Sequence, residues 1–207
     1  MFLDLPPSGW PQATPLLCAI YVFLSQQVSG FYAPSLFLHL HNKILFQMKQ
    51  FKIVPLSEDY ARKLRENQKD DFGHEIVEQV ATGKGPCRVS LKPFSVGEDV
   101  RLLLSHSPFS FDNAFDQPGP IFIHKKEVEA YKDVHRFPPE IKADKESFPL
   151  TLIGYSKEQK MVFTRLVGDD DIDLLIPKLF EEQAEVEYFH VRNAEACCFI
   201  CKIEKIE

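Results

Sequence analysis

The stretch EVEYFHVRNAEACCFICKIE, residues 185–204, decides the fold that this sequence predicts. Two runs of strand-forming residues flank a polar break, Arg192-Asn193-Ala194-Glu195, which is typical of a β-hairpin. Side chains of a strand point alternately to its two faces, so Tyr188, His190 and Arg192 share one face of the first strand. We therefore expect an imidazole and a guanidinium to stand together on this face, beside a strand that carries thiols.

The three cysteines of the return strand divide between its two faces. Cys197 and Cys201 share one face, whereas Cys198 points to the other. Cys197 and Cys201 lie about 13 Å apart at about 3.3 Å per residue, which is too far for joint ligation of one zinc ion. Cys198 and Cys201 have a CxxC spacing, but strand geometry puts them on opposite faces. We predict no metal site, interpret Cys197 and Cys201 as small buried residues, and expect a Cys197–Cys198 disulfide only if the strand is broken.

Composition indicates one folded domain and excludes several classes of protein. A chain of 207 residues with 44% hydrophobic residues is long and apolar enough to bury a core. A net charge of −6 argues against a nucleic-acid binder, because phosphate contacts need a surplus of lysine and arginine. Five cysteines, an odd number with three inside residues 197–201, do not resemble the spaced framework of a secreted disulfide protein. We expect a reduced, cytoplasmic compartment.

Residues 1–47 differ in kind from the rest of the chain. Asp4 and Lys43 are their only formal charges. A secretory signal would need a positive segment before the first apolar run, and a transmembrane helix needs about 18 or more consecutive apolar residues. A third interpretation is that the native chain begins at Met48, because a charged strand-and-helix pattern starts directly after it. We expect this leader to lie outside a domain formed by residues 48–207, and membrane association only if the leader is present.

Apolar runs and turn residues predict the remaining elements. The expected strands are 51–56, 89–91, 100–104, 121–124, 150–155 and 161–166 together with the closing hairpin, and the expected helices are 57–67, 72–81 and 169–183 with a further helical stretch at 125–133. Strands outnumber helices and mostly join by hairpins. The predicted fold is therefore a single α+β domain, with about six or seven short strands in a largely antiparallel sheet and two or three helices.

Polar side chains stand at the turns and strand ends of this predicted sheet. Gly85–Arg88 delivers a thiol, Cys87, and a guanidinium, Arg88, while His124 closes a short strand. If Arg88 converges with Arg192, the natural ligand is a carboxylate or phosphate group, which two guanidinium groups can grip with paired hydrogen bonds. The alternative for each arginine is an ion pair with Glu98 or another acid. A neighbouring cation would also activate the thiol of Cys87 as a nucleophile.

Sequence signatures of the common cofactor and catalytic sites are absent. The chain has no His-Glu-x-x-His spacing, no glycine-rich phosphate loop and no Gly-x-Ser-x-Gly elbow. Ser105 and His106 are adjacent in sequence, which does not favour a catalytic triad. Asp169–Asp171 is interpreted as the acidic start of a helix, because a calcium loop needs alternating acids and a turn glycine. We predict no cofactor.

Four motifs, in order along the chain, carry a resemblance to a known family. They are GPCRVSL (85–91), the Gly-Glu before VRLLL (97–104), GPIFIH (119–124) and HVRNAEACCF (190–199). Together they resemble a bacterial family known as domain of unknown function number 1203, over roughly residues 49–204. The resemblance leaves residues 1–47 outside and implies no activity.

In that family the first motif usually reads Cys-Arg-x-Cys-Leu and the last contains His-x-Arg followed by Gly-Cys-Phe. The resemblance therefore assigns Cys87 and Arg88 to the first motif, and His190, Arg192 and Cys198 to the last. Two residues depart from the pattern. Ser90 stands at the position of the second cysteine and Cys197 at that of the glycine, so a redox pair or metal site that needs a thiol at position 90 is doubtful in this chain.

Two functions are compatible with these residues, and the sequence does not decide whether the protein is an enzyme. The first is binding of, or action on, a small anionic molecule in a pocket of Arg88, His124, His190 and Arg192, with Cys87 or Cys198 as a nucleophile. The second is a non-catalytic protein-interaction domain, which forms a homodimer or docks a partner through the aromatic loop Pro108–Phe115. The second function predicts an exposed apolar patch on that loop.

Overall fold

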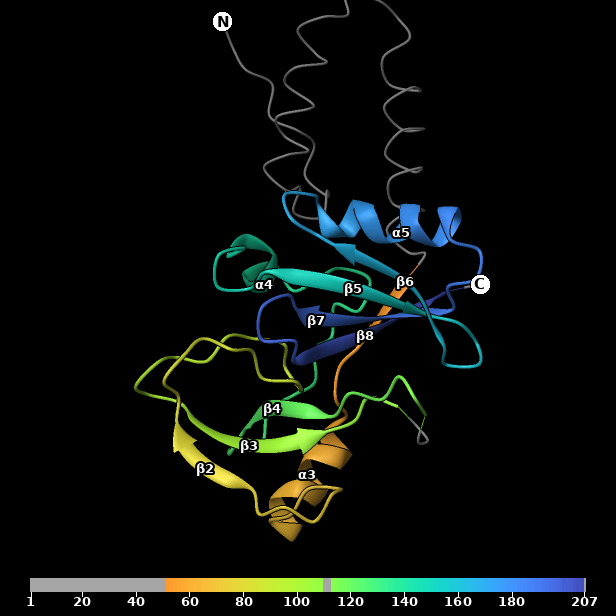
Figure 1. The fold of residues 1–207 in the computed structure, drawn as a ribbon. Coiled ribbons are helices and arrows are strands. Elements are labelled where there is room, and N and C mark those ends of the chain that lie inside the picture. Colours follow the sequence, from red (N-terminus) through yellow and green to blue (C-terminus); the bar gives the residue numbers. More distant parts are fainter. Residues whose placement is uncertain (1–50, 110–112, 207) are drawn as a thin grey trace, which may run out of the picture. The chain divides into compact units, whose positions relative to one another are not determined.

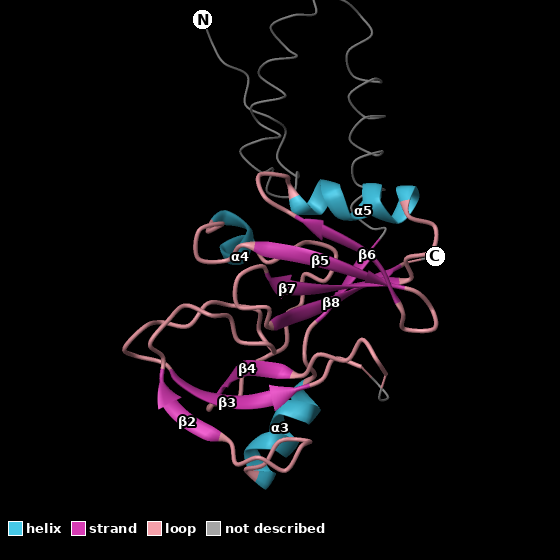
Figure 2. Ribbon diagram, viewed as in Figure 1, coloured by secondary structure: helices cyan, strands magenta, loops and turns pink. Residues whose placement is uncertain are grey.

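The computed structural model describes residues 51–109 and 113–206, which form eight strands and three helices (Figure 1, Figure 2). The strands are β1 (Phe51–Val54), β2 (Val77–Val80), β3 (Val100–His106), β4 (Gly119–His124), β5 (Leu150–Tyr155), β6 (Met161–Leu166), β7 (Tyr188–Asn193) and β8 (Phe199–Lys205), and the helices are α3 (Glu58–Asn67), α4 (Pro139–Ala143) and α5 (Ile172–Glu182). The predicted leader, residues 1–47, lies outside the described residues. Over the described part of the chain, no helix is both long and apolar enough to cross a membrane.

The strands form two antiparallel sheets rather than one. The larger sheet has the order β1-β8-β7-β5-β6 and the smaller has the order β2-β3-β4. The hairpins that the sequence predicts, β5 with β6 and β7 with β8, are both present. The predicted α+β class with antiparallel pairing is therefore confirmed, and the division into two sheets is the feature that the sequence pattern did not predict.

Strand β7 lies at the centre of the larger sheet, and both of its faces are covered. Every residue of β7 except Asn193 is buried. Phe189 and Val191 belong to a core that includes the buried face of α5. The opposite face carries His190 and Arg192 and looks toward the smaller sheet, which lies across β7 and β8 from α5 in Figure 1.

A register shift in the closing hairpin directs side chains of β8 into two different hydrophobic cores. Between Val191 and Arg192 the pairing slips, so that Arg192 faces Phe199 while Val191 faces Cys201. A bulge of this kind re-aims the side chains next to it. Phe199 consequently packs into the second core, with residues of the smaller sheet, while Cys201 stays in the first.

The two long helices begin where the sequence predicts. Ser57 caps α3, and its hydroxyl oxygen accepts from the backbone N–H of Tyr60 at 3.2 Å. Asp171 caps α5 by accepting from the backbone N–H of Asp173 at 3.0 Å. The acids at 169–171 therefore include a helix cap, as predicted.

The helix predicted at 72–81 is wrong, because a buried carboxylate forces a turn there. Asp70 accepts hydrogen bonds from the backbone N–H groups of Phe72, His74 and Ser105. The bond to Ser105 holds the following residues beside β3, and they form the edge strand β2 instead. Tertiary contacts here override a local helical pattern.

Two further local predictions are also wrong. Arg88–Ser90 is a turn rather than the start of a strand, and Leu91 has a left-handed φ of 53° with its N–H bonded to the carbonyl of Cys87. Residues 125–133 form no helix, and the short α4 follows the double proline instead.

Candidate functional site

The turn at residues 88–90 places Arg88 between the two sheets. Its backbone N–H donates to Phe122 of β4 at 3.0 Å, and its carbonyl accepts from Leu56 at 2.8 Å. The side chain is 1% exposed. Its Nε donates to the carbonyl of Phe199 at 2.5 Å and its Nη2 donates to Sγ of Cys198 at 3.3 Å, while Nη1 donates to the carbonyl of Pro86.

Arg192 reaches the same hairpin from β7. Its Nη1 donates to the carbonyl of Cys197 at 2.8 Å, and its Nη2 donates to the carbonyl of Gln117 at 3.2 Å. The side chain is 3% exposed, and its Nε has no hydrogen-bond partner. Arg88 and Arg192 therefore converge on the loop 197–199 from two directions.

Both guanidinium groups are buried without a carboxylate partner in the described part of the chain. The predicted alternative, an ion pair with Glu98 or another acid, is therefore wrong there. Of the five N–H donors of a guanidinium, Arg88 uses three and Arg192 uses two, and all their acceptors are backbone carbonyls or a thiol. Burial lowers the pKa of both groups because hydration is lost. Nearby thiols oppose this shift at both arginines, and the carboxylate of Asp116 opposes it to a smaller extent at Arg192.

A third buried arginine shows how this fold compensates such a charge elsewhere. Arg101 is 5% exposed and also lacks a carboxylate, but its guanidinium lies 3.9 Å from the ring centroid of Phe122. A cation over an aromatic face is stabilised by the ring quadrupole. Within the described residues neither Arg88 nor Arg192 lies over such a ring, so these two buried guanidinium groups have neither a salt bridge nor an aromatic partner.

His190 stands beside Arg192 as predicted, inside a box of aromatic rings. Its ring centroid lies 4.7 to 5.3 Å from those of Tyr155, Phe109, Tyr188 and Phe199. The side chain is fully buried, and neither ring nitrogen has a hydrogen-bond partner. Burial first, and then the charge of Arg192, lowers the pKa of His190 to about 3, so the imidazole is neutral at physiological pH.

His106, which sequence reasoning set aside, also belongs to this region. Its ring lies 5.7 Å from that of Phe199, and its Nδ1 is 3.5 Å from the hydroxyl of Tyr60, which donates to Asp71. Burial lowers the pKa of His106 to about 4, with Arg88 and Arg192 acting in the same direction. The sequence could have indicated His106 through its position at the end of β3, because strand ends of the smaller sheet meet the larger sheet there.

The four cysteines of the described residues are free thiols in different surroundings. Cys87 and Cys201 are fully buried, so Cys87 cannot meet a dissolved substrate as the predicted nucleophile without local opening. Cys198 is half-buried, with its sulfur held by Arg88. Cys197 is exposed in the loop before β8, and the prediction that it fills a sheet face is wrong.

The structure does not bring His124 to the two arginines. Its ring packs 4.5 Å from that of Phe94, and its Nδ1 lies 4.0 Å from a carboxylate oxygen of Asp99. Burial lowers its pKa. His124 therefore belongs to the side of the smaller sheet that carries Arg101, with which it pairs across β3 and β4.

The motifs that meet in this region are those on which the family resemblance rests. The family model described as "Protein of unknown function (DUF1203)" matches residues 84–205, more than half of the chain. The chain belongs to the DUF1203 family. The match begins later than the resemblance suggested, so β1, α3 and β2 lie before it. No curated protein and no solved structure matches the chain.

The two departures from the DUF1203 motifs occupy unusual positions in the structure. Cys197, at the position of a glycine, has a left-handed φ of 57°, a conformation that glycine adopts without strain. Ser90, at the position of a cysteine, has a buried hydroxyl oxygen without a hydrogen-bond partner. The backbone conformation at position 197 thus favours a glycine, and the buried, unpaired site at position 90 favours a cysteine, as in the family motifs.

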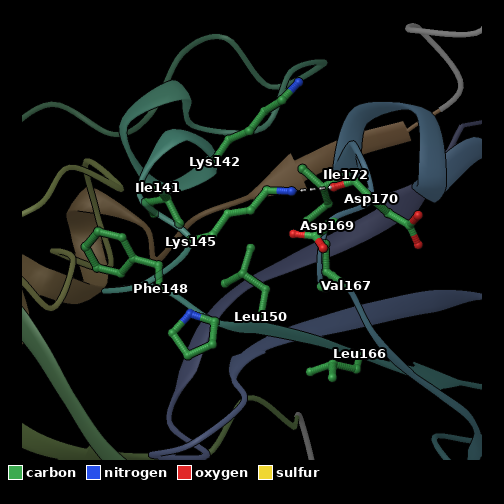
Figure 3. A pocket seen from close by; sticks show the side chains of 12 residues that line it. Ile141, Lys142, Lys145, Phe148, Leu150, Leu166, Val167, Asp169, Asp170 and Ile172 are labelled. Atoms are coloured by element: carbon green, nitrogen blue, oxygen red, sulfur yellow. Dashed lines mark hydrogen bonds between the residues drawn. The ribbon is translucent and has the colours of Figure 1, made fainter.

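A cavity of about 240 Å³ lies elsewhere, between α4, the ends of β5 and β6, and the start of α5 (Figure 3). Its floor is apolar, with Phe148, Leu150 and Val167 among its lining residues. At its rim Lys145 donates to the backbone carbonyl of Asp170, and Lys142 is paired with two aspartates. Most of its polar groups are therefore already engaged, which gives a specific ligand little to bind.

No group of three or more histidine, cysteine, aspartate or glutamate side chains in the described ranges is arranged to hold a metal ion. The charged groups that are buried in this region, Arg88 and Arg192, are cationic, and a buried cation favours an anion rather than a metal ion as its ligand.

Proposed function

We propose that this DUF1203 protein binds a small anionic molecule, a carboxylate or a phosphate, through Arg88 and Arg192. The single observation that carries the proposal is the burial of both guanidinium groups without a salt bridge to any acid among the described residues. A buried charge without a partner is costly, and proteins normally pair it. An anion would supply a negative charge and accept hydrogen bonds from the N–H groups that remain free.

The free donors favour a planar or tetrahedral oxyanion over a simple halide. Arg192 keeps its Nε unpartnered, and its contact with the carbonyl of Gln117, at 3.2 Å, is the longer of its two bonds. Displacing that carbonyl would expose Nε and Nη2 together, which is the fork that binds two oxygens of one carboxylate or phosphate.

The neutral histidines support the same proposal. His190 and His106 add no positive charge at neutral pH, because burial lowers the pKa of the first to about 3 and of the second to about 4. A neutral imidazole has one N–H donor and one acceptor nitrogen, so each ring can donate a hydrogen bond to a ligand or accept one from it.

The alternative, a protein-interaction domain, gains no specific support from the described residues. Phe109 of the predicted docking loop is half-buried and packs against His190 and Tyr155, and residues 110–112 lie outside the described residues. A homodimer remains a prediction. A cytoplasmic location is likewise proposed, supported by the free state of the four described cysteines.

Thermal unfolding with a panel of anions tests the proposal. Phosphate, sulfate and short mono- and dicarboxylates are compared with chloride at equal ionic strength. A ligand at a hundred times its Kd adds about 2.7 kcal/mol of stability, which raises the Tm of a protein of this size by roughly 5 to 10 °C. Arg192→Gln should abolish the shift, whereas Arg165→Gln, at an exposed arginine paired with Asp170, should keep it. A panel without any shift, or an equal shift in Arg192→Gln, would overturn the proposal.

A further inference from the structure

The loop between β7 and β8 places two thiols next to each other outside any strand. Residues 194–196 form a turn, Cys197 follows with a left-handed φ of 57°, and β8 begins at Phe199 after Cys198. The condition under which the sequence allowed a Cys197–Cys198 disulfide, a break in the strand, is thus met. Cys197 is exposed and Cys198 half-buried, so both sulfurs are within reach of small solutes.

The two thiols share the electrostatic field of Arg192 but differ in the partner that their sulfur contacts. Sγ of Cys198 accepts from Nη2 of Arg88 at 3.3 Å. Sγ of Cys197 has only a long contact, 3.8 Å, with the carbonyl of Glu195. A thiol held by a guanidinium is the kind that reacts as a thiolate, whereas an exposed thiol without a cation in contact is a slower nucleophile but can attack an oxidised neighbour.

We propose that Cys198 and Cys197 form a redox pair that reacts with hydroperoxides. The thiolate of Cys198 attacks one oxygen of the peroxide, the O–O bond breaks, and the products are a sulfenic acid on Cys198 and water or an alcohol after protonation. The thiol of Cys197 then attacks that sulfur and expels water, which gives the vicinal disulfide. The peroxide is reduced by two electrons, and the two thiols together are oxidised by two. This inference goes beyond anion binding and does not depend on it.

The disulfide would be strained and therefore easily reversed. Adjacent Cα atoms are about 3.8 Å apart across a trans peptide, less than the usual separation of about 4.4 to 6.8 Å in a disulfide. Strained disulfides have more oxidising potentials and are reduced by cellular thiols. Oxidation would also change the sulfur to which Arg88 donates, so the redox state would change the contacts of that buried arginine.

Peptide mapping of the full-length protein after hydrogen peroxide treatment tests the proposal. Trypsin cleaves after Arg192 and Lys202, and the resulting peptide carries Cys197, Cys198 and Cys201. Buried Cys201, whose pKa is raised by burial, is an unreactive control within the same peptide. In the native chain the peptide should lose two hydrogens, with the new bond between positions 197 and 198, and dithiothreitol should restore it.

Two serine variants separate the roles of the thiols. Cys197→Ser should accumulate a dimedone-reactive sulfenic acid on Cys198, and Cys198→Ser should slow oxidation of the hairpin by about tenfold or more. Three results would each overturn the proposal. They are equal oxidation rates in the two variants, a disulfide bond that involves Cys201, and no oxidation at either position under conditions that oxidise free glutathione. None of these readouts uses an anion, so failure of the redox pair is distinguishable from failure of anion binding.

Discussion

The guanidinium of Arg88 donates to the sulfur of Cys198 over 3.3 Å, although 110 positions separate the two residues in sequence. This bond joins the first DUF1203 motif to the last and lies between the two sheets. Arg88 also bonds to the carbonyl of Phe199, so one side chain fixes the start of β8 at two points.

The contact predicts an order of thiol reactivity that exposure alone would reverse. Cys197 is exposed and Cys198 half-buried, so access favours Cys197, whereas the guanidinium favours Cys198. In native protein at neutral pH, we expect iodoacetamide to label Cys198 roughly five times faster than Cys197, because the guanidinium in contact with the sulfur of Cys198 favours the negative charge that develops there as the thiol reacts. Time-resolved peptide mass spectrometry measures both rates, and faster labelling of Cys197 would show that access decides.

The buried imidazole of His190 predicts a loss of stability in acid. Its pKa is about 3 in the folded protein and about 6.5 in the unfolded chain, so between these values the unfolded chain binds the extra proton. The free energy of unfolding should therefore fall by about 1 kcal/mol per pH unit on this account as pH drops from 6.5 toward 3. His106, with a pKa of about 4, adds a second contribution of the same sign.

Replacement of His190 tests the assignment of this slope. His190→Phe should flatten the pH dependence and keep the protein stable, because a phenyl ring suits a box of Tyr155, Phe109 and Phe199 and leaves no nitrogen unpaired. His190→Gln should flatten it equally but lower stability at every pH. Urea unfolding across pH measures both effects, and an unchanged slope in both variants would refute the assignment.

The left-handed backbone of Cys197 predicts that glycine stabilises the loop. At a φ of 57° a side chain clashes with its own backbone, which costs roughly 1 kcal/mol and which glycine avoids. Cys197→Gly should raise the free energy of unfolding by about 0.5 kcal/mol after the greater freedom of glycine in the unfolded chain is included. Cys197→Ala is the matched control, since it removes the thiol and keeps the strain. Denaturant unfolding in which alanine equals glycine would contradict this explanation.

The unpaired hydroxyl of Ser90 predicts that the family cysteine fits better. A buried hydroxyl without a hydrogen bond costs about 1 to 3 kcal/mol, whereas a thiol is a weak donor and loses little when unpaired. Ser90→Cys should therefore stabilise the protein by about 1 kcal/mol. Ser90→Ala, which removes the hydroxyl and leaves a smaller side chain, should gain less. A lower midpoint for Ser90→Cys in chemical denaturation would mean that the hydroxyl is hydrogen-bonded in solution.

Hairpins, helix caps and the class of the fold follow from local signals in this sequence. The β7–β8 hairpin and the caps at Ser57 and Asp171 depend on residues within a few positions of each other, so alternation and cap chemistry suffice. The strand β2 was missed because its state depends on the bond from the backbone of Ser105 to Asp70, 35 positions away.

The candidate site shows the same limit. Alternation alone places His190 beside Arg192, and the turn at Gly85–Arg88 adds Arg88, which the motif resemblance also includes. The bulge after Val191 turns Phe199 toward the smaller sheet. It depends on how β7 and β8 pair and pack against that sheet, and no local pattern in the sequence indicates it. For this reason the sequence predicted His124 in the site and omitted His106, whose place depends on how the two sheets meet.

The most direct test of anion binding observes the Nε–H groups of the buried arginines. In ¹⁵N NMR of arginine-labelled protein, the Nε of Arg192 should shift progressively and saturate as phosphate or a carboxylate is added, because it has no partner in the described structure. The Nε of Arg101, equally unpartnered but facing Phe122, is the matched control and should not move. Saturable movement of Arg192 alone is the predicted result. An unchanged Arg192, or equal and unsaturable movement of both arginines, would contradict anion binding at this site.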